Sequence, residues 1–224
     1  MGTSIFEIIG PIMIGPSSSH TAGAVKIGRL ARAILAEKPV DAKIDLHGSF
    51  ARTYKGHGTD RALVGGLLGF GPDDERLRDS LRLAHEAGLQ VIFQFPDLEA
   101  ELGPLHPNTA RLTLKGQNGL TVRIVGSSIG GGRAVVTRID DFEARITGEY
   151  PALVTLHRDK PGVIAALTRI LADAGINIAG MTVSRTGRRG RALAVIETDE
   201  AIDSSIADLA RAHQGVERAI VIVP

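Results

Sequence analysis

The chain has 224 residues, of which 26 are Lys or Arg and 25 are Asp or Glu, so its formal net charge is +1. A charge this balanced gives no electrostatic case for nucleic-acid binding, which calls for clustered basic residues. Cysteine is absent, which excludes disulfides, thiolate nucleophiles and any cysteine-ligated metal cluster held by this chain.

The length suits one large domain or two modest ones, because domains commonly contain about 100–150 residues. No apolar run approaches the roughly 20 residues that a membrane helix needs. The first residues show no basic segment followed by an apolar core. We therefore expect no membrane span, no signal peptide and a cytoplasmic location.

The N-terminal part, residues 1–147, is expected to be a mixed α/β domain. Apolar residues repeat at helical spacing from Ile27 to Leu35. The fold class is α+β. The pattern does not determine the strand order of this half, so its topology is left undetermined. The other expected elements are a strand over 43–46, a helix over 62–68 that opens near Gly58, a charged helix over 72–87, and strands over 90–95, 110–114, 120–125 and 134–139.

A glycine and a proline within residues 148–152 mark the expected boundary, and residues 148–224 form the second domain. Its expected order is strand–helix–strand–strand–helix–strand, the ferredoxin-like βαββαβ arrangement. Helices would then cover one face of an antiparallel sheet and leave an edge strand free to pair with a second copy. The expected elements are strands over 153–156, 176–185, 192–198 and 216–223, and helices over 163–174 and 202–210.

The first stretch that could carry chemistry runs over 15–23, where a glycine–proline turn and three serines lead into the first long helix. A helix N-terminus exposes unpaired N–H groups and a partial positive charge, which suits a carboxylate or phosphate. Plain N-capping is the alternative, although one serine suffices for a cap. The candidate residues are Ser17, Ser18, Ser19, His20 and Thr21.

Two further stretches contain histidine beside glycine, at 47–51 and 55–62. Glycines on both sides of His57 let the backbone approach another molecule closely, and histidine is the natural proton carrier near neutral pH. Thr59 and Asp60 could cap the following helix, or Asp60 could orient a histidine.

Two other stretches leave the choice open. At 105–108, Pro107 biases His106 towards an extended conformation, so a turn is as plausible as a site. At 126–133, a glycine-rich loop could cradle an anion or could simply connect two strands. It matches neither a Walker loop nor a dinucleotide fingerprint, and the N-terminal histidines are too scattered to argue for zinc.

Several of these motifs together resemble the beta chain of iron–sulfur-dependent L-serine dehydratases. They are Gly-Pro-Ser-Ser-Ser-His-Thr at 15–21, His-Gly-Thr-Asp at 57–60 and Ser-Ile-Gly-Gly-Gly at 128–132. Asp-Lys-Pro-Gly-Val at 159–163, followed by Asn-Ile at 177–178, resembles an ACT domain. The resemblance covers nearly the whole chain, and its N-terminal half is similar to the allosteric-substrate-binding domain of some phosphoglycerate dehydrogenases.

The resemblance implies that the enzyme converts L-serine to pyruvate and ammonia, a step of amino-acid catabolism that feeds gluconeogenesis. It implies a 4Fe-4S cluster, acting as a Lewis acid on the serine hydroxyl and held by the cysteines of a partner alpha subunit. The absence of cysteine here agrees with that division. This chain would be a clusterless beta subunit, inactive alone.

The resemblance also implies roles for particular residues. His20 and His57 would face a composite active site, one of them as a proton carrier, and the stretch 17–21 would help to hold an anionic group at the subunit junction. In the ACT half, a small amino acid would bind at a dimer interface and bias the quaternary state. The substrate-binding candidates are Ser17, Ser18, Ser19, Thr21, Thr59 and Asp60, and the regulatory-ligand candidates are Asp159, Gly162, Asn177 and Ile178.

Two other functions remain open on the sequence. The chain could be a non-catalytic amino-acid sensor that regulates another enzyme, such as a serine-biosynthetic dehydrogenase. It could also be a structural oligomerisation module. The serine–histidine stretch argues against the sensor, because a sensor needs no pair of histidines beside an anion site.

Overall fold

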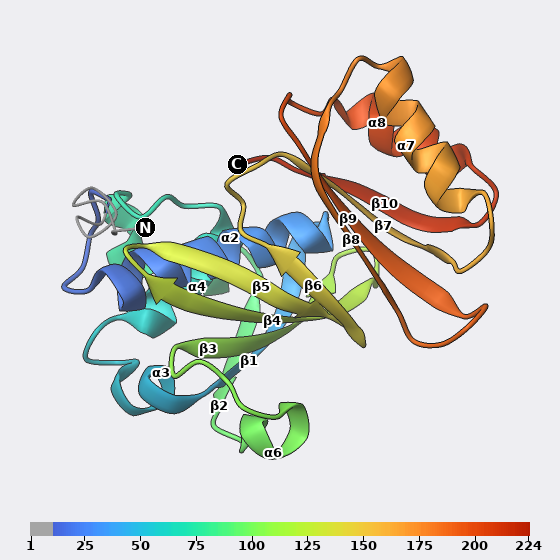
Figure 1. Cartoon of the computed structure of the whole chain (residues 1–224). Coiled ribbons are helices and arrows are strands. Elements are labelled where there is room, and N and C mark those ends of the chain that lie inside the picture. The colour runs from blue at the N-terminus through green and yellow to red at the C-terminus, as the bar shows by residue number, and fades with distance from the viewer. Residues whose placement is uncertain (1–10) are drawn as a thin grey trace, which may run out of the picture. The chain divides into compact units, whose positions relative to one another are not determined.

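A computed structural model describes residues 11–224 of the chain. The chain forms two compact units, residues 1–137 and 138–224, and each is described by itself (Figure 1). Within the described residues, no helix is both long and apolar enough to cross a membrane.

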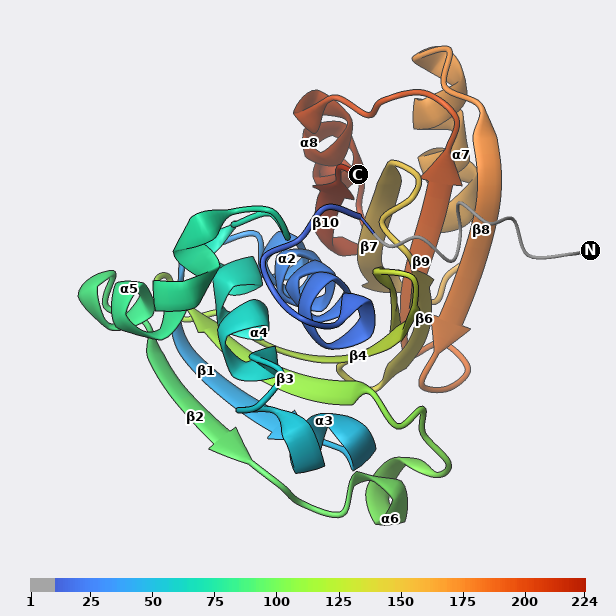
Figure 2. The ribbon, with the colours of Figure 1, turned by 90° about the vertical axis from the view of Figure 1, so that its left-hand side faces the viewer.

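The first unit is built on a mixed sheet with helices packed on one face (Figure 2). The strand order within this unit is β2-β1-β3-β4-β5, with β1 parallel to β2 and antiparallel to β3. Its strands are β1 (Pro39–Leu46), β2 (Gln90–Gln94), β3 (Thr109–Gly116), β4 (Thr121–Gly130) and β5 (Arg133–Ile139), and β6 (Phe142–Ile146) belongs to the second unit. The helical segments are a π-helical turn η1 (Ser18–Ala22), α2 (Gly23–Leu35), α3 (Gly48–Thr53), α4 (Thr59–Leu68), the 3-10 turn η2 (Glu75–Asp79), α5 (Ser80–Glu86) and α6 (Leu98–Leu102).

Two glycines allow α2 and α4 to cross closely. A Cβ atom on Gly28 would lie 2.3 Å from the carbonyl oxygen of Leu63, and one on Gly66 would lie 2.2 Å from that of Val25. Backbone therefore meets backbone at this crossing, which no larger residue permits without moving a helix. The crossing brings the beginnings of the two helices, and the loops that precede them, to the same end of the unit.

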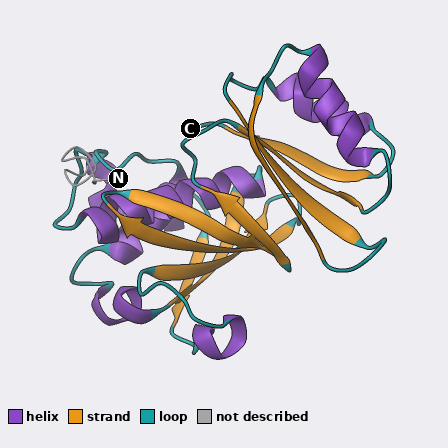
Figure 3. Ribbon diagram, in the orientation of Figure 1, coloured by secondary structure: helices purple, strands orange, loops and turns teal. Residues whose placement is uncertain are grey.

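The second unit has the expected ferredoxin-like order, with the sheet order β10-β7-β9-β8 and all three pairings antiparallel. Both helices cover one face of the sheet (Figure 3). Leu153, Leu167, Leu171, Ile196 and Ile206 form part of the core between the two layers. The elements are β7 (Ala152–Arg158), α7 (Val163–Asp173), β8 (Ile178–Arg185), β9 (Arg191–Thr198), α8 (Ser204–Ala212) and β10 (Val216–Ile222).

The α+β class and the βαββαβ order are therefore confirmed, but several details differ. The charged helix expected over 72–87 is wrong at its beginning, because residues 72–74 form a turn before η2 and α5. The short elements α3, α6 and β6 were not expected, since segments of five or six residues carry too little periodicity to detect. The two units divide within β5, ten residues before the expected boundary at 147, which stays a prediction.

Candidate active site

The site is organised around His20, which lies in the turn η1 that leads into α2. Ser17 takes the N-cap position, and its hydroxyl oxygen accepts the backbone N–H of His20 at 3.2 Å. Both ring nitrogens of His20 face serine hydroxyls. Nδ1 lies 3.2 Å from Oγ of Ser19 and 3.4 Å from Oγ of Ser17, and Nε2 lies 3.2 Å from Oγ of Ser49. The hydroxyls thus hold the imidazole at both nitrogens.

The second imidazole, His57, meets the first at a right angle. The two ring centroids are 4.8 Å apart with an interplanar angle of 85°. His57 lies in the loop between α3 and α4, and Gly58 follows it with φ of +69°, a left-handed conformation that favours glycine. The Nδ1 atom of His57 is buried and has no hydrogen-bond partner among the described residues. His20 is therefore fixed by hydrogen bonds at both ring nitrogens, whereas no hydrogen bond from a described residue fixes Nδ1 of His57.

The surroundings favour the neutral form of His20. Its side chain is only 7% exposed and stacks edge-on against Phe50, with centroids 5.2 Å apart. Burial lowers the pKa of His20 below its ordinary value, and the nearby His57 lowers it further, while Ser49 opposes the change. A neutral imidazole at neutral pH can accept a proton.

The other candidate residues of this half divide into two groups. Thr21 and Thr59 are buried, and the hydroxyl of each lacks a partner among the described residues. The side chains of Ser18 and Asp60 make no hydrogen bond to either imidazole within residues 11–224. Asp60 instead accepts the backbone N–H of Arg61 at 2.8 Å, and its burial raises the pKa of the carboxyl. Gly58, not Thr59 or Asp60, takes the N-cap position of α4.

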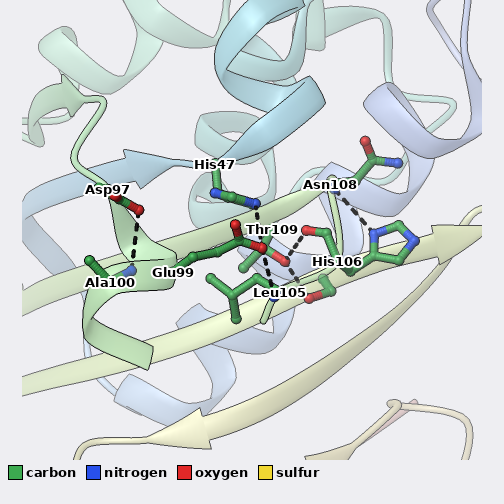
Figure 4. Close-up of polar contacts among 9 residues, drawn as sticks. His47, Asp97, Glu99, Ala100, Leu105, His106, Asn108 and Thr109 are labelled. Carbon is green, nitrogen blue, oxygen red and sulfur yellow. Dashed lines mark hydrogen bonds and ion pairs between the residues drawn. The ribbon is translucent and has the colours of Figure 1, made fainter. Parts of the chain in front are cut away.

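The loop at 105–108 proves to be a turn with hydrogen bonds of its own (Figure 4). His106 Nδ1 accepts the backbone N–H of Asn108 at 3.1 Å, and its carbonyl oxygen accepts the hydroxyl of Thr109 at 2.7 Å. Glu99 on α6 accepts the backbone N–H of Leu105 at 3.1 Å and lies 3.7 Å from Nε2 of His47. The turn interpretation therefore holds for His106, and the partner of the His47 ring is Glu99.

This turn nevertheless positions the site. The carbonyl oxygen of Pro107 accepts the backbone N–H of Ser49 at 2.7 Å. A Cβ atom on Gly48 would lie 2.6 Å from that same oxygen, so the approach requires glycine at this position, where φ is +56°. The turn thereby anchors the first residues of α3, from which Ser49 reaches His20.

The glycine-rich stretch at 126–133 connects two neighbouring strands. β4 runs to Gly130, and Gly131 and Gly132 turn the chain into β5 with positive φ angles. Ser128 donates its backbone N–H to the carbonyl oxygen of Asn108 at 2.9 Å, and its buried hydroxyl packs against Gly23 at the beginning of α2. This stretch is therefore the connection between β4 and β5. Through Ser128 it also packs against the beginning of α2.

The four regulatory-ligand candidates of the second unit do not all meet. Asn177 and Ile178 line a hollow with α7, beside Ala165, Thr168 and Arg169. Asp159 lies elsewhere, where its carboxylate accepts Nη1 of Arg185 and the backbone N–H of Arg189, each at 3.0 Å. These contacts lower the pKa of Asp159, the backbone N–H of Arg189 most of all. Gly162, with φ of +93°, caps the beginning of α7.

No group of three or more His, Asp or Glu side chains within residues 11–224 is arranged to hold a metal ion. Sequence reasoning overlooked Ser49 as a partner of His20, although the stretch that contains it was singled out. It also overlooked the cations beside His57. Lys55 and Arg61 were visible in the flanking sequence, but nothing in the local sequence connects Arg78 with the site.

The fold and the site define a class of protein: an N-terminal unit with two imidazoles in contact, one of them held by serine hydroxyls, joined to a ferredoxin-like unit. Residues 152–213 match the ACT domain family. Residues 4–138, more than half of the chain, match the family described as serine dehydratase beta chain, and the chain belongs to that family.

Curated relatives agree over nearly the whole length. The chain is 45% identical to the "Probable L-serine dehydratase, beta chain" of Bacillus subtilis (strain 168), over 92% of this chain and 91% of the relative. It is 40% identical to the "L-serine dehydratase, beta chain" of Peptoniphilus asaccharolyticus, over 96% and 94%. It is also 36% identical to "L-serine dehydratase TdcG" of Escherichia coli (strain K12), over 58% of this chain and 32% of that longer protein.

Proposed function

We propose that this chain is the beta subunit of an L-serine ammonia-lyase, which converts L-serine to pyruvate and ammonia together with a cysteine-bearing alpha subunit. The observation that carries the proposal is the contact of His57 with His20, whose ring is held by serine hydroxyls, in a chain whose full-length relatives are named for L-serine dehydratase. Such a pair can move a proton near neutral pH.

The elimination requires that the α-proton be removed, that the hydroxyl leave and that the substrate be held. This chain has no cysteine, so a 4Fe-4S cluster would be bound by the alpha subunit. When bound there, the cluster would supply Lewis acidity toward the serine hydroxyl. His20, kept neutral by burial, and His57, with a free ring nitrogen, supply the proton-carrying groups.

Hydroxyl groups of the first unit are proposed to hold the substrate. Ser17, Ser19 and Thr21 lie in or beside the turn η1, and Thr59 lies in the first turn of α4. The unpaired hydroxyls of Thr21 and Thr59 are expected to gain partners when a ligand is present, because an unsatisfied buried hydroxyl is costly. Ser18 and Asp60 are proposed to complete this set.

The ferredoxin-like unit is proposed to regulate the enzyme. The hollow beside Asn177 and Ile178 is suited to a small amino acid, and Gly162 begins the helix that forms its other wall. The unit would also dimerise through β8, an edge strand on which Met181 and Val183 are 45% and 48% exposed. A ligand at such an interface could bias the quaternary state. Asp159 would contribute indirectly, by holding the tip of the β8–β9 hairpin.

The test measures pyruvate release from L-serine under anaerobic conditions, with iron and sulfide present. Three samples are compared: this chain alone, its cysteine-bearing partner alone, and the mixture. Activity in the mixture alone is the expected result. If the mixture is inactive while visible absorption shows the partner's cluster intact, the lyase proposal fails and the amino-acid sensor takes its place.

A further inference from the structure

The two ring nitrogens of His20 have different surroundings. Nδ1 lies at the N-terminal end of η1, 3.2 Å from Oγ of Ser19 and 3.4 Å from Oγ of Ser17. Nε2 lies 3.2 Å from Oγ of Ser49, which belongs to α3. A neutral imidazole carries its proton on only one of these nitrogens, and the partners of the ring decide which one.

The surroundings of Nδ1 favour a lone pair on that atom. The backbone N–H of His20 donates to Oγ of Ser17 at 3.2 Å, so the Ser17 hydroxyl keeps its own proton to donate. It can donate to Oγ of Ser19, 3.3 Å away, and the Ser19 hydroxyl can then donate to Nδ1. Hydrogen bonds that run in one direction strengthen each other. The partial positive charge at the beginning of a helix also favours a lone pair at this end of the ring.

The surroundings of Nε2 favour the proton. Burial lowers the pKa of His20 and His57 lowers it further, whereas hydrogen bonding to the backbone of Ser49 raises it. The backbone N–H of Ser49 is donated to the carbonyl oxygen of Pro107 at 2.7 Å. The backbone group of Ser49 that is left for the ring is therefore its carbonyl oxygen, which can only accept a proton. An N–H on Nε2 satisfies this contact, and a lone pair does not.

The main chain of Ser49 is fixed on both sides. Its N–H donates to Pro107, and its carbonyl oxygen accepts the hydroxyl of Thr53 at 2.9 Å. The next residue, Phe50, is fully buried and packs edge-on against the His20 ring. Because the backbone is already ordered, little conformational entropy is lost when the Ser49 hydroxyl meets Nε2.

Neither Ser49 nor His20 lines the cavity beside the imidazole pair. This cavity has a volume of about 370 Å³, and His57 lines it. The rings of His20 and His57 meet edge to face, and no hydrogen bond joins them within the described part of the chain. Ser49 therefore acts on the site through the orientation of His20. Three cations also line the cavity: Lys55, Arg61 and Arg78.

We propose that Ser49 is a positioning residue that accepts the Nε2 proton of His20, and that it thereby fixes the tautomer of His20 and the angle at which this ring meets His57. The importance of Ser49 for turnover rests on the function proposed above, whereas the tautomer is a property of this chain alone. Without its hydroxyl, the backbone carbonyl is the only partner that Ser49 offers to Nε2. The ring can then turn, or carry its proton on Nδ1, and its contact with His57 changes.

The first test determines the tautomer in the full-length chain without its partner. Long-range hydrogen–nitrogen correlation NMR of isotope-labelled histidine distinguishes the two tautomers, and the spectrum of His20→Gln identifies the His20 signals. We expect His20 to carry its proton on Nε2 at neutral pH. Ser49→Ala should give a mixture with the Nδ1–H form. Ser49→Thr, which keeps the hydroxyl, should restore the wild-type pattern.

Ser80→Ala is the matched control. Ser80 is fully buried, and its hydroxyl donates to the carbonyl oxygen of Arg61 at 2.7 Å. The variant therefore removes a serine hydrogen bond from the same unit without touching a partner of His20. It should lower the stability towards urea and leave the tautomer of His20 unchanged. Circular dichroism checks that Ser49→Ala is folded.

The second test measures turnover of L-serine in the two-subunit mixture. Ser49→Ala should lower kcat by about five- to tenfold, as loss of one hydrogen bond does. KM should change by less than about twofold, because an interaction that only orients a catalytic group affects kcat more than substrate binding. Ser49→Thr should recover kcat.

A His20 proton on Nδ1 in the wild type, or an identical tautomer in Ser49→Ala and wild type, would overturn the assignment. A raised KM with unchanged kcat in Ser49→Ala would contradict a positioning role. If the wild-type mixture is inactive, the lyase proposal fails, and the spectra still decide the tautomer.

Discussion

His20 and His57 illustrate how a residue acquires its chemistry from its neighbours. Histidine titrates near neutral pH in water, but burial against Phe50 disfavours its charged form at position 20. Coulombic repulsion from His57, whose ring centroid lies 4.8 Å away, disfavours it further. The serine hydroxyls then determine which way the neutral ring faces.

The first prediction concerns the titration of His20. We expect an NMR titration of the folded chain to give His20 a pKa below 6.5, the value from which it is lowered, and His57→Gln to bring that pKa only part of the way back, because burial is the larger cause. The urea-unfolded chain provides the reference. A His20 pKa at or above the unfolded value would contradict the described environment.

The lowered pKa of His20 also makes the stability of the fold depend on pH. Because the folded pKa of His20 is lowered, the unfolded chain binds the proton more readily, and acidification favours unfolding. The stability contributed by neutral His20 is therefore complete above the unfolded pKa of about 6.5 and is lost as the pH falls towards the folded pKa. Burial also lowers the pKa of His157 in the second unit, so protonation of His157 favours unfolding as well.

The second prediction concerns turnover in the two-subunit complex. His57→Gln should lower kcat by about 10²-fold or more, as removal of a general acid–base group does. His85→Gln, at an exposed position at the end of α5, should leave kcat unchanged. Wild-type turnover in His57→Gln, with an unaltered circular dichroism spectrum, would exclude proton transfer by that residue.

At the scale of elements, a buried ion pair links β1 to β3. Asp45 and Arg111 are register partners, and the Nε–H of Arg111 donates to Oδ2 of Asp45 at 2.8 Å. The two side chains are 1% and 10% exposed. Arg111 also pairs with Glu101 on α6, so a single guanidinium connects two strands and a helix. Loss of that guanidinium would leave the Asp45 carboxylate buried and unpaired.

The third prediction follows from that contact. Arg111→Met should lower the free energy of unfolding by about 3–5 kcal/mol, because loss of the guanidinium leaves the Asp45 carboxylate buried without a partner. The double variant Asp45→Leu/Arg111→Met should recover most of the loss. Arg82→Met breaks an exposed pair with Glu86 and should change little. Urea unfolding checks all three variants, and equal effects of Arg111→Met and Arg82→Met would contradict the argument.

At the scale of the whole molecule, the two units have different surfaces to offer. The first presents a cationic cavity and an imidazole pair, and the second presents the edge strand β8. A sheet edge with unpaired backbone groups and exposed apolar side chains is a template for pairing with another chain.

The fourth prediction concerns assembly through β8. Met181→Lys/Val183→Lys places two charges on this strand and should lower the molar mass measured by light scattering after size-exclusion chromatography. Leu209→Lys, on α8, replaces a side chain that is 55% exposed and should leave the mass unchanged. An unchanged oligomer in the double variant, or a monomeric wild type, would rule out assembly through this edge.

The sequence by itself determined the features that depend on neighbours along the chain. Apolar periodicity identified the βαββαβ order of the second unit and the long helix after the serines, because the spacing of apolar residues follows the geometry of each element. Composition excluded a cysteine-ligated cluster held by these residues, since they include no cysteine. The three stretches with serine or histidine beside glycine were visible for the same local reason.

Only the tertiary structure decided which of these stretches meet. His20, Ser49 and His57 converge because the glycine-mediated crossing of α2 and α4 and the anchoring of α3 by Pro107 bring three loops together. The tertiary structure also paired His47 with Glu99, closed His106 into a turn with Asn108, and placed Arg78 and His57 at the same cavity. Packing between elements depends on side-chain volumes and backbone approach across long separations in sequence, and no local pattern records these.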